Sequence, residues 1–382
     1  SPINAMVQLA DVSKVSRNWQ VIGWMGALAG FMILSFYAVI AGWAMAYVLE
    51  MMSGRFVGVA PAQAAASFET FISDPVQVVA WQTGFMVLTI AIAARGVGRG
   101  LEVTVRYLMP ALFFLLVALV IYSAVTSGRF VDGLAFLFQP DFARFDSSSL
   151  ITAMGQAFFT LSLGMGAIMA YGAYMPKGSS IVGTAATIAV LDTSVALMSG
   201  LVIFPLVFAN GLESSAGPGL MFITLPIAFG QMTGGQIFGT AFFVLVSFAA
   251  ITSSISLLEP AVAWVVEKTS LGRAKAASLV GGVAWLLGLG SALSFNLGAD
   301  WTLPNGFNFF DTMDYVSNNI LLPLGGILIA VFAGWRLSGE ILQEQMKEDQ
   351  GALTLWRFLT RYLAPVGVLI VFIVTILQTV EL

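Results

Sequence analysis

Long stretches without a charged side chain divide the chain into segments whose length suits membrane-spanning helices. A helix needs about 20 predominantly apolar residues to cross the hydrocarbon core of a bilayer. Backbone in lipid must satisfy its own hydrogen bonds, which favours helices, and the pattern lacks the short alternating segments of an outer-membrane barrel. We therefore predict nine spans with these approximate bounds: 18–50, 75–95, 104–127, 147–176, 180–210, 234–267, 274–296, 309–336 and 355–380.

Positive charges sort to one side of this arrangement, as cytoplasmic loops of membrane proteins carry an excess of Lys and Arg. With residues 1–17 in the cytoplasm and a short dip at roughly 219–232, the inside segments hold 13 of the 16 cations. Outside lie only Arg55, Arg129 and Arg144. Because an added or removed span would scramble this sorting, we expect nine crossings and an extracellular or periplasmic C-terminus.

Composition excludes a soluble fold and most catalytic chemistry. The chain is 58% hydrophobic and only 9% charged, whereas a soluble domain carries about 25% charged residues. It has no Cys and no His, which excludes disulfides, thiolate or imidazole metal sites and nucleophile–histidine triads. Without a Walker or Rossmann loop either, we expect no enzyme. The scattered cations and the net charge of -4 indicate no nucleic-acid partner.

Three carboxylates lie within or near predicted spans, where an ionisable group is a functional candidate by default. Asp192 interrupts the fifth span and has no nearby Lys or Arg in the sequence. We interpret it as a cation site, the alternative being a carboxylate hydrogen-bonded to hydroxyls of neighbouring helices. Glu259 precedes Pro260 in the sixth span, where a structural role is favoured. Asp314 stands near the outer mouth of the eighth span.

The fourth span is poorly suited to a continuous helix. It carries Gly164 and Gly166, preceded by Thr160 and Ser162, and glycine weakens a helix interior by about 1 kcal/mol relative to alanine. A break would leave backbone groups free to hold a ligand, and broken helices at membrane depth are tolerated where they line a cavity. The alternative is close helix packing through small residues.

Two further patterns suggest ligand contacts. Ile33 and Tyr37 lie one helical turn apart in the middle of an uncharged stretch, where a buried phenol needs a partner. In the sixth span, small or hydroxyl-bearing residues recur on one helical face and could offer oxygen atoms to a monovalent cation. Such hydroxyls also bond back to their own helix, so this pattern alone decides little. Its members are Ala249, Thr252, Ser253, Ser256 and Leu257.

At these positions the chain resembles the neurotransmitter:sodium symporter family, in its bacterial form. Residues 158–166 (FFTLSLGMG) resemble the signature of that family's sixth helix, and residues 33–43 (ILSFYAVIAGW) its third. Residues 249–256 (AAITSSIS) are similar to its eighth helix, and residues 217–226 (GPGLMFITLP) to its extracellular re-entrant loop. Order and spacing agree along essentially the whole chain.

The resemblance implies an all-α integral membrane protein of the leucine-transporter type, with two five-helix repeats inverted relative to each other. The whole chain, 1–382, would be one transmembrane transporter domain with a re-entrant extracellular loop at 217–232. The nine predicted spans would correspond to the family's helices three to eleven. We therefore expect the first two helices, which supply part of the family's binding site, to precede Ser1 in a longer protein.

Carried over by position, the resemblance also implies roles for individual residues. The substrate site would comprise Ile33, Tyr37, Phe159, Ser162, Met165, Ser253 and Leu257. Within that site, Tyr37 would bind the substrate carboxylate and Phe159 would close the cavity. Thr160 and Asp192 would belong to a first sodium site, and Ala249, Thr252 and Ser253 to a second. Asp314 would be the outer gate and Glu267 the inner gate.

The expected function is sodium-coupled import of a neutral, hydrophobic amino acid by alternating access. Family members often have asparagine in place of Asp192 and animal members use chloride, so we expect this carboxylate to make chloride unnecessary. The expected partners are sodium, the amino acid and the lipid bilayer of the plasma membrane, with no organic cofactor; a homodimer stays open. Two alternatives remain, a transport-incompetent fragment and a proton-coupled transporter of the same fold in which Asp192 titrates.

Overall fold

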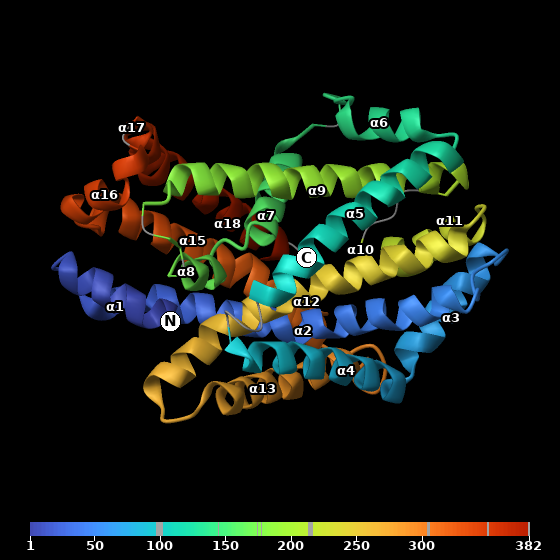
Figure 1. Cartoon of the computed structure of the whole chain (residues 1–382), viewed down its shortest axis with the longest axis horizontal. Helices are drawn as coiled ribbons and strands as arrows, with labels where there is room; N and C mark the ends of the chain where they lie inside the picture. Colours follow the sequence, from blue (N-terminus) through green and yellow to red (C-terminus); the bar gives the residue numbers. More distant parts are fainter. Residues whose placement is uncertain are drawn as a thin grey trace.

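The two longest helices, α2 (Val21–Met52) and α12 (Gly235–Lys268), form the most extensive helix pair of the computed structural model. Two more long helices, α4 (Pro75–Ala94) and α13 (Arg273–Leu293), pack beside them (Figure 1). The structure describes residues 1–96, 102–143, 145–173, 175–176, 178–212, 217–303, 306–349 and 351–380. Arg99, Arg144 and Lys177, cations used in the charge sorting, lie outside these described residues.

A second group of helices lies above this pair in Figure 1. There α5 (Glu102–Thr126) packs against both α9 (Ile181–Ala209) and α12, and α6 (Phe130–Phe138) lies on α9. Near the C-terminus, α15 (Leu322–Val331) packs against α18 (Ala364–Val380). The remaining helical segments are α1 (Pro2–Val12), η1 (Arg17–Gln20), α3 (Pro61–Ser73), α14 (Phe309–Tyr315), η4 (Val316–Leu321), η5 (Phe332–Arg336), α16 (Gly339–Gln345), η6 (Lys347–Asp349), α17 (Leu353–Phe358) and η7 (Leu359–Leu363).

Eight helices among the described residues are long and apolar enough to cross a membrane. The fourth predicted span is not one of them, because it is divided into α7 (Ser147–Thr160) and α8 (Ala167–Gly172). The interruption falls on residues 161–166, where the paired glycines predict a broken helix. The predicted break is therefore confirmed, and it accounts for the difference between eight uninterrupted helices and nine predicted crossings.

The apolar segment 217–230 folds as three short helical pieces, which together are too short to be a candidate span. Its residues pack into the interior: Phe222 is fully buried and its ring stacks on Phe68 of α3 with centroids 5.6 Å apart. Trp43 of α2 meets Phe222 edge to face. Aromatic packing thus anchors this segment to α2 and α3. Its pieces are α10 (Gly217–Gly219), η3 (Leu220–Thr224) and α11 (Leu225–Gly230).

Candidate functional site

A central cavity of about 290 Å³ opens where α2, α7, α9 and α12 meet the break between α7 and α8. Its volume is near the lower end of the range of about 300–1,000 Å³ that is usual for small-molecule sites. All seven residues predicted to bind substrate line it, together with Thr160 and Asp192 from the predicted first sodium site. The full lining is Ile33, Tyr37, Gln156, Phe159, Thr160, Ser162, Met165, Ala167, Asp192, Ser253, Ser256 and Leu257.

The break that borders this cavity has a backbone that a helix cannot adopt. Ser162, Gly164 and Gly166 have φ values of 54°, 83° and 74°, in the left-handed region. The helical hydrogen bonds of α7 end with Leu163, whose N–H donates to the carbonyl of Phe158, and α8 begins with the bond from Ala170 to Gly166. Left-handed geometry costs an L-residue about 1–2 kcal/mol, so glycines suit two of these positions and Ser162 is strained.

Two glycine contacts hold the break in place. A Cβ on Gly26 of α2 would lie 2.8 Å from the backbone nitrogen of Gly166. A Cβ on Gly164 would lie 2.6 Å from the carbonyl oxygen of Leu322, the first residue of α15. Both separations are too short for a real Cβ, so only glycine lets these backbones approach. The close-packing interpretation and the broken-helix interpretation of the glycines are therefore both correct.

The hydroxyl-bearing face of α12 divides into two parts. Ser253 is exposed to the cavity and its side chain faces the hydroxyl of Tyr37. Thr252 is buried and donates to the carbonyl of Ala249 at 2.9 Å, and neither of these two residues lines the cavity. Of the predicted second sodium site, only Ser253 reaches the cavity in this conformation. Thr252 instead bonds back to its own helix.

Asp192 and Thr160 supply the cavity with a carboxylate and a hydroxyl from α9 and α7. Asp192 is half-buried, and no ion pair to it is present in the described part of the chain. A charged carboxylate at membrane depth costs free energy, and a bound cation lowers this cost, so a half-buried carboxylate favours cation binding. The pair is suited to a monovalent cation coordinated by oxygen atoms.

Glu259 has the structural role that the sequence favoured. Its carboxylate is 1% exposed and receives both terminal nitrogens of Arg273, with one N–O distance of 2.9 Å. The Nε of Arg273 also donates to the carbonyl of Ala93 at 3.0 Å. This buried ion pair joins α12, α13 and α4 away from the central cavity.

Neither of the two predicted gate residues is among the residues that line the central cavity. Asp314 of α14 accepts a hydrogen bond of 2.7 Å from the side-chain amide of Asn318 and is not among the residues that line the cavity. Glu267 lies at the end of α12, where its carboxylate accepts from the side-chain amide of Asn4 at 2.5 Å. It borders a separate cavity that Glu259 also lines.

Three further residues line the cavity that the resemblance had not assigned to the substrate or sodium sites. Gln156 precedes Thr160 by four residues and therefore shares its face of α7. Ser256 belongs to the hydroxyl pattern of α12, and the phenol of Tyr171 donates to it. Ala167 begins α8. Helical spacing in the sequence could have identified Gln156 and Ser256, because each shares a helix face with a predicted site residue. Nothing in the sequence distinguishes Ala167.

Comparison with known proteins agrees with this geometry. The profile described as "Sodium:neurotransmitter symporter family" matches residues 63–382. The chain belongs to the sodium:neurotransmitter symporter family. Within that family, it is 37% identical over 359 residues to the uncharacterized sodium-dependent transporter YhdH of Bacillus subtilis, covering 93% of this chain and 79% of the relative. A second uncharacterized sodium-dependent transporter, from Haemophilus influenzae, is 32% identical and covers 96% of this chain and 81% of the relative.

A solved member of the symporter fold supports the architecture. The crystal structure of MhsT in complex with L-phenylalanine superposes with a TM-score of 0.84 at 44% identity, covering 93% of this chain and 81% of MhsT. The predicted all-helical, leucine-transporter-type fold is thus confirmed. As a member of this symporter family, the protein is a sodium-dependent membrane transporter and not an enzyme.

Proposed function

We propose that the protein is a symporter that couples sodium entry to the import of a neutral, hydrophobic amino acid by alternating access. The observation that carries this proposal is the central cavity, in which the predicted substrate residues gather beside the broken helix. Its apolar walls come from Ile33, Met165 and Leu257, and they suit a hydrophobic side chain. The complex of MhsT, which holds L-phenylalanine, supports the same class of substrate.

Within this proposal, Tyr37 donates its hydroxyl to the carboxylate of the amino acid, and Phe159 closes the cavity over the side chain. Ser162 and Ser253 supply polar contacts at the two sides of the cavity. An apolar cavity discriminates between side chains that differ by a methylene by only about 1–3 kcal/mol. We therefore expect several hydrophobic amino acids to compete for the site.

Sodium would bind at two places. Thr160 and Asp192 line the cavity and would hold a first ion, which the substrate carboxylate can help to coordinate. Ala249, Thr252 and Ser253 would hold a second ion, since the Thr252 hydroxyl donates its proton to Ala249 and keeps its oxygen lone pairs for a cation. Because Asp192 brings its own negative charge, the proposal does not require chloride.

The proposed transport cycle uses the whole chain as one transmembrane domain. Asp314 would control access from the outside and Glu267 access from the cytoplasm, with residues 1–17 in the cytoplasm and the C-terminus outside. The segment 217–232 would dip into the bilayer from the outer face. A membrane potential contributes about 2.3 kcal/mol per elementary charge per 100 mV to such a cycle, so sodium entry can drive accumulation.

Uptake by purified protein in liposomes tests the proposal. An inward sodium gradient should drive accumulation of labelled L-leucine or L-phenylalanine, and potassium in place of sodium should abolish it. Tyr37→Phe should weaken apparent affinity by about 10- to 100-fold, since it removes one hydrogen bond to a charged group. Tyr47→Phe, the same change in a buried ring on the same helix, is the matched control.

The same assay separates the alternatives. Uptake driven by a pH gradient without sodium would indicate proton coupling and contradict the proposal. Sodium-dependent binding without uptake would indicate that this chain retains the site but does not transport. Equal effects of the two tyrosine substitutions would contradict the role given to Tyr37.

A further inference from the structure

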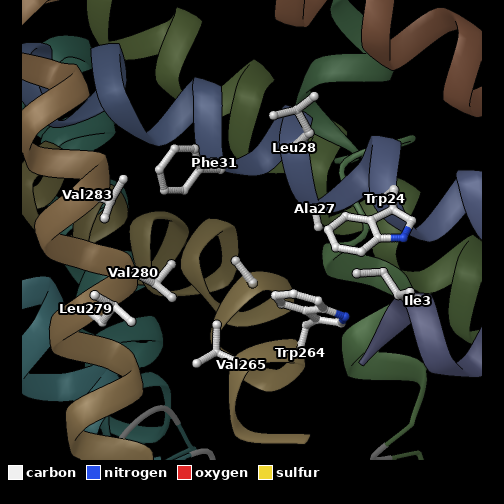
Figure 2. A pocket seen from close by; sticks show the side chains of 11 residues that line it. Ile3, Trp24, Ala27, Leu28, Phe31, Trp264, Val265, Leu279, Val280 and Val283 are labelled. Carbon is white, nitrogen blue, oxygen red and sulfur yellow. The ribbon is translucent and has the colours of Figure 1, made fainter. Parts of the chain in front are cut away.

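A second cavity, of about 380 Å³, lies on the outside of the helix bundle between α2, α12 and α13. Figure 2 shows its walls, which consist entirely of carbon-rich side chains. The residues that shape it most are Trp24, Phe31, Trp264, Leu279, Val280 and Val283. We refer to it as the α2–α12–α13 groove. It is separate from the central cavity, with which it shares no lining residue.

The groove is exposed on helices that are long and apolar enough to cross a membrane. Leu279 and Val283 lie one turn apart on α13 and are 53% and 48% exposed, and all three helices that form the groove are candidate spans. In water such an apolar surface would favour a protein partner. In a bilayer the surrounding solvent is hydrocarbon, so an acyl chain is the natural occupant.

One end of the groove is polar and positively charged. A neighbouring cavity of about 370 Å³ shares Ile3, Trp24 and Trp264 with the groove and adds the side chains of Arg17 and Lys268. The indole rings of Trp24 and Trp264 meet edge to face, with centroids 4.8 Å apart, where the two cavities join. Tryptophan is enriched at the membrane–water interface, so the apolar groove lies at the depth of acyl chains and the charged cavity at the depth of headgroups.

Two carboxylates lie near the two cations at this end, those of Asp11 and Glu267, and Glu267 accepts from the side-chain amide of Asn4, which lines the same cavity. Arg17 makes two hydrogen bonds to the carboxylate of Asp11, at 2.7 and 2.9 Å, and is neutralised by it. Lys268 is exposed one turn beyond Trp264, and the described part of the chain contains no ion pair to its ammonium group. Lys268 is thus a cation that no carboxylate pairs with among the described residues, and its position above an apolar groove is complementary to an anionic headgroup above an acyl chain.

We propose that the α2–α12–α13 groove binds an anionic glycerophospholipid of the leaflet on the basic side of the membrane. One acyl chain would lie against Phe31, Val280 and Val283, and the phosphate-bearing headgroup beside Lys268. The site would select anionic over zwitterionic lipids. An anionic headgroup would bring only negative charge to Lys268, whereas a zwitterionic headgroup would also bring a positive charge. It stands independently of the proposed substrate.

Competition between two lipids with the same acyl chains tests the charge component. The purified chain in detergent is mixed with equal amounts of dioleoyl-phosphatidylglycerol and dioleoyl-phosphatidylcholine, and native mass spectrometry counts the lipids retained. We expect one phosphatidylglycerol to be retained preferentially. Lys268→Gln should weaken its retention about fivefold, the contribution of one basic residue near an anionic lipid surface, whereas Lys347→Gln, at an exposed lysine of η6, should not.

Filling the groove tests the apolar component. Val283→Phe should reduce retention of phosphatidylglycerol, and Val366→Phe, at a similarly exposed valine of α18, should leave it unchanged. In bilayers, phosphatidylglycerol with brominated acyl chains should quench the fluorescence of Trp24 and Trp264. The double variant Trp24→Phe/Trp264→Phe should lose the saturable part of this quenching. This readout remains available should Val283→Phe fold poorly.

Three results would overturn the proposal. Equal retention of the two lipids would show that the groove takes ordinary bilayer lipid without selection. Lys268→Gln with unchanged retention would contradict the headgroup position. A dimer free of bound lipid, disrupted by Val283→Phe and not by Val366→Phe, would show that a second copy of the chain covers the groove.

Discussion

A single added methyl group at Gly164 should disturb the site more than most substitutions in the cavity. Gly164 has a φ of 83°, and its Cβ would stand 2.6 Å from the carbonyl oxygen of Leu322. The left-handed backbone costs an alanine about 1–2 kcal/mol. Displacing a packed backbone costs about 1–3 kcal/mol more. Gly164→Ala should therefore destabilise the protein by about 2–5 kcal/mol in total.

Thermal unfolding in detergent and equilibrium binding of a labelled amino acid measure the two consequences. The apparent melting temperature should fall by about 2–6 °C, given an unfolding entropy of about 2.1 cal/mol/K per residue. Because Ser162 and Met165 flank the substituted residue, substrate affinity should fall by at least about tenfold, or 1.4 kcal/mol. Gly155→Ala is the control, since a Cβ at that position on α7 meets nothing within 4 Å. Equal stability and affinity in the two variants would refute the account of the break.

Three further results are expected. Glu259→Gln should lower stability by about 3 kcal/mol by leaving Arg273 without its carboxylate, and adding Arg273→Gln should restore part of the loss in thermal unfolding; strictly additive losses would contradict the pairing. The Ser180 hydroxyl and two backbone N–H groups of α9 lower the pKa of Asp349. The stabilisation is therefore present above the unfolded pKa of about 3.9 and is lost as the pH falls through the lower folded pKa. Asp349→Asn should be less stable than wild type at pH 7 but not in strong acid; a pH-independent difference would contradict this. Asp192→Asn should abolish uptake or make it chloride-stimulated, and unchanged chloride-free uptake would contradict the role of Asp192.

The sequence predicted the features that depend on local composition. Gly164 and Gly166 indicated the break because glycine is a poor helix former, and one-turn spacing on α2 paired Ile33 with Tyr37. The left-handed conformation of Ser162 had no such signal, because glycine or asparagine usually occupies this position after a helix. Here the N–H groups of Ser162 and Leu163 cap α7 by donating to the carbonyls of Phe159 and Phe158, with Ser162 at a φ of 54°.

Features that depend on how helices rotate against one another escaped prediction. The face from Ala249 to Leu257 is continuous by period, yet Ser253 reaches the cavity and Thr252 does not, since helical spacing says nothing about which part of a face meets a cavity. The partner of Glu259 was equally hidden: Arg273 begins the next helix, and only the packing of α13 against α12 brings the two side chains together.

Coupled binding of sodium and substrate is the most direct test of the central claim, because it requires no transport. The affinity for a labelled hydrophobic amino acid is measured at increasing sodium, and the affinity for sodium at increasing amino acid, with ionic strength held constant. Thermodynamic linkage requires the same factor in both directions. We expect sodium to raise substrate affinity by at least about tenfold, the substrate to raise sodium affinity equally, and Asp192→Asn to reduce both. Substrate affinity independent of sodium would contradict the account.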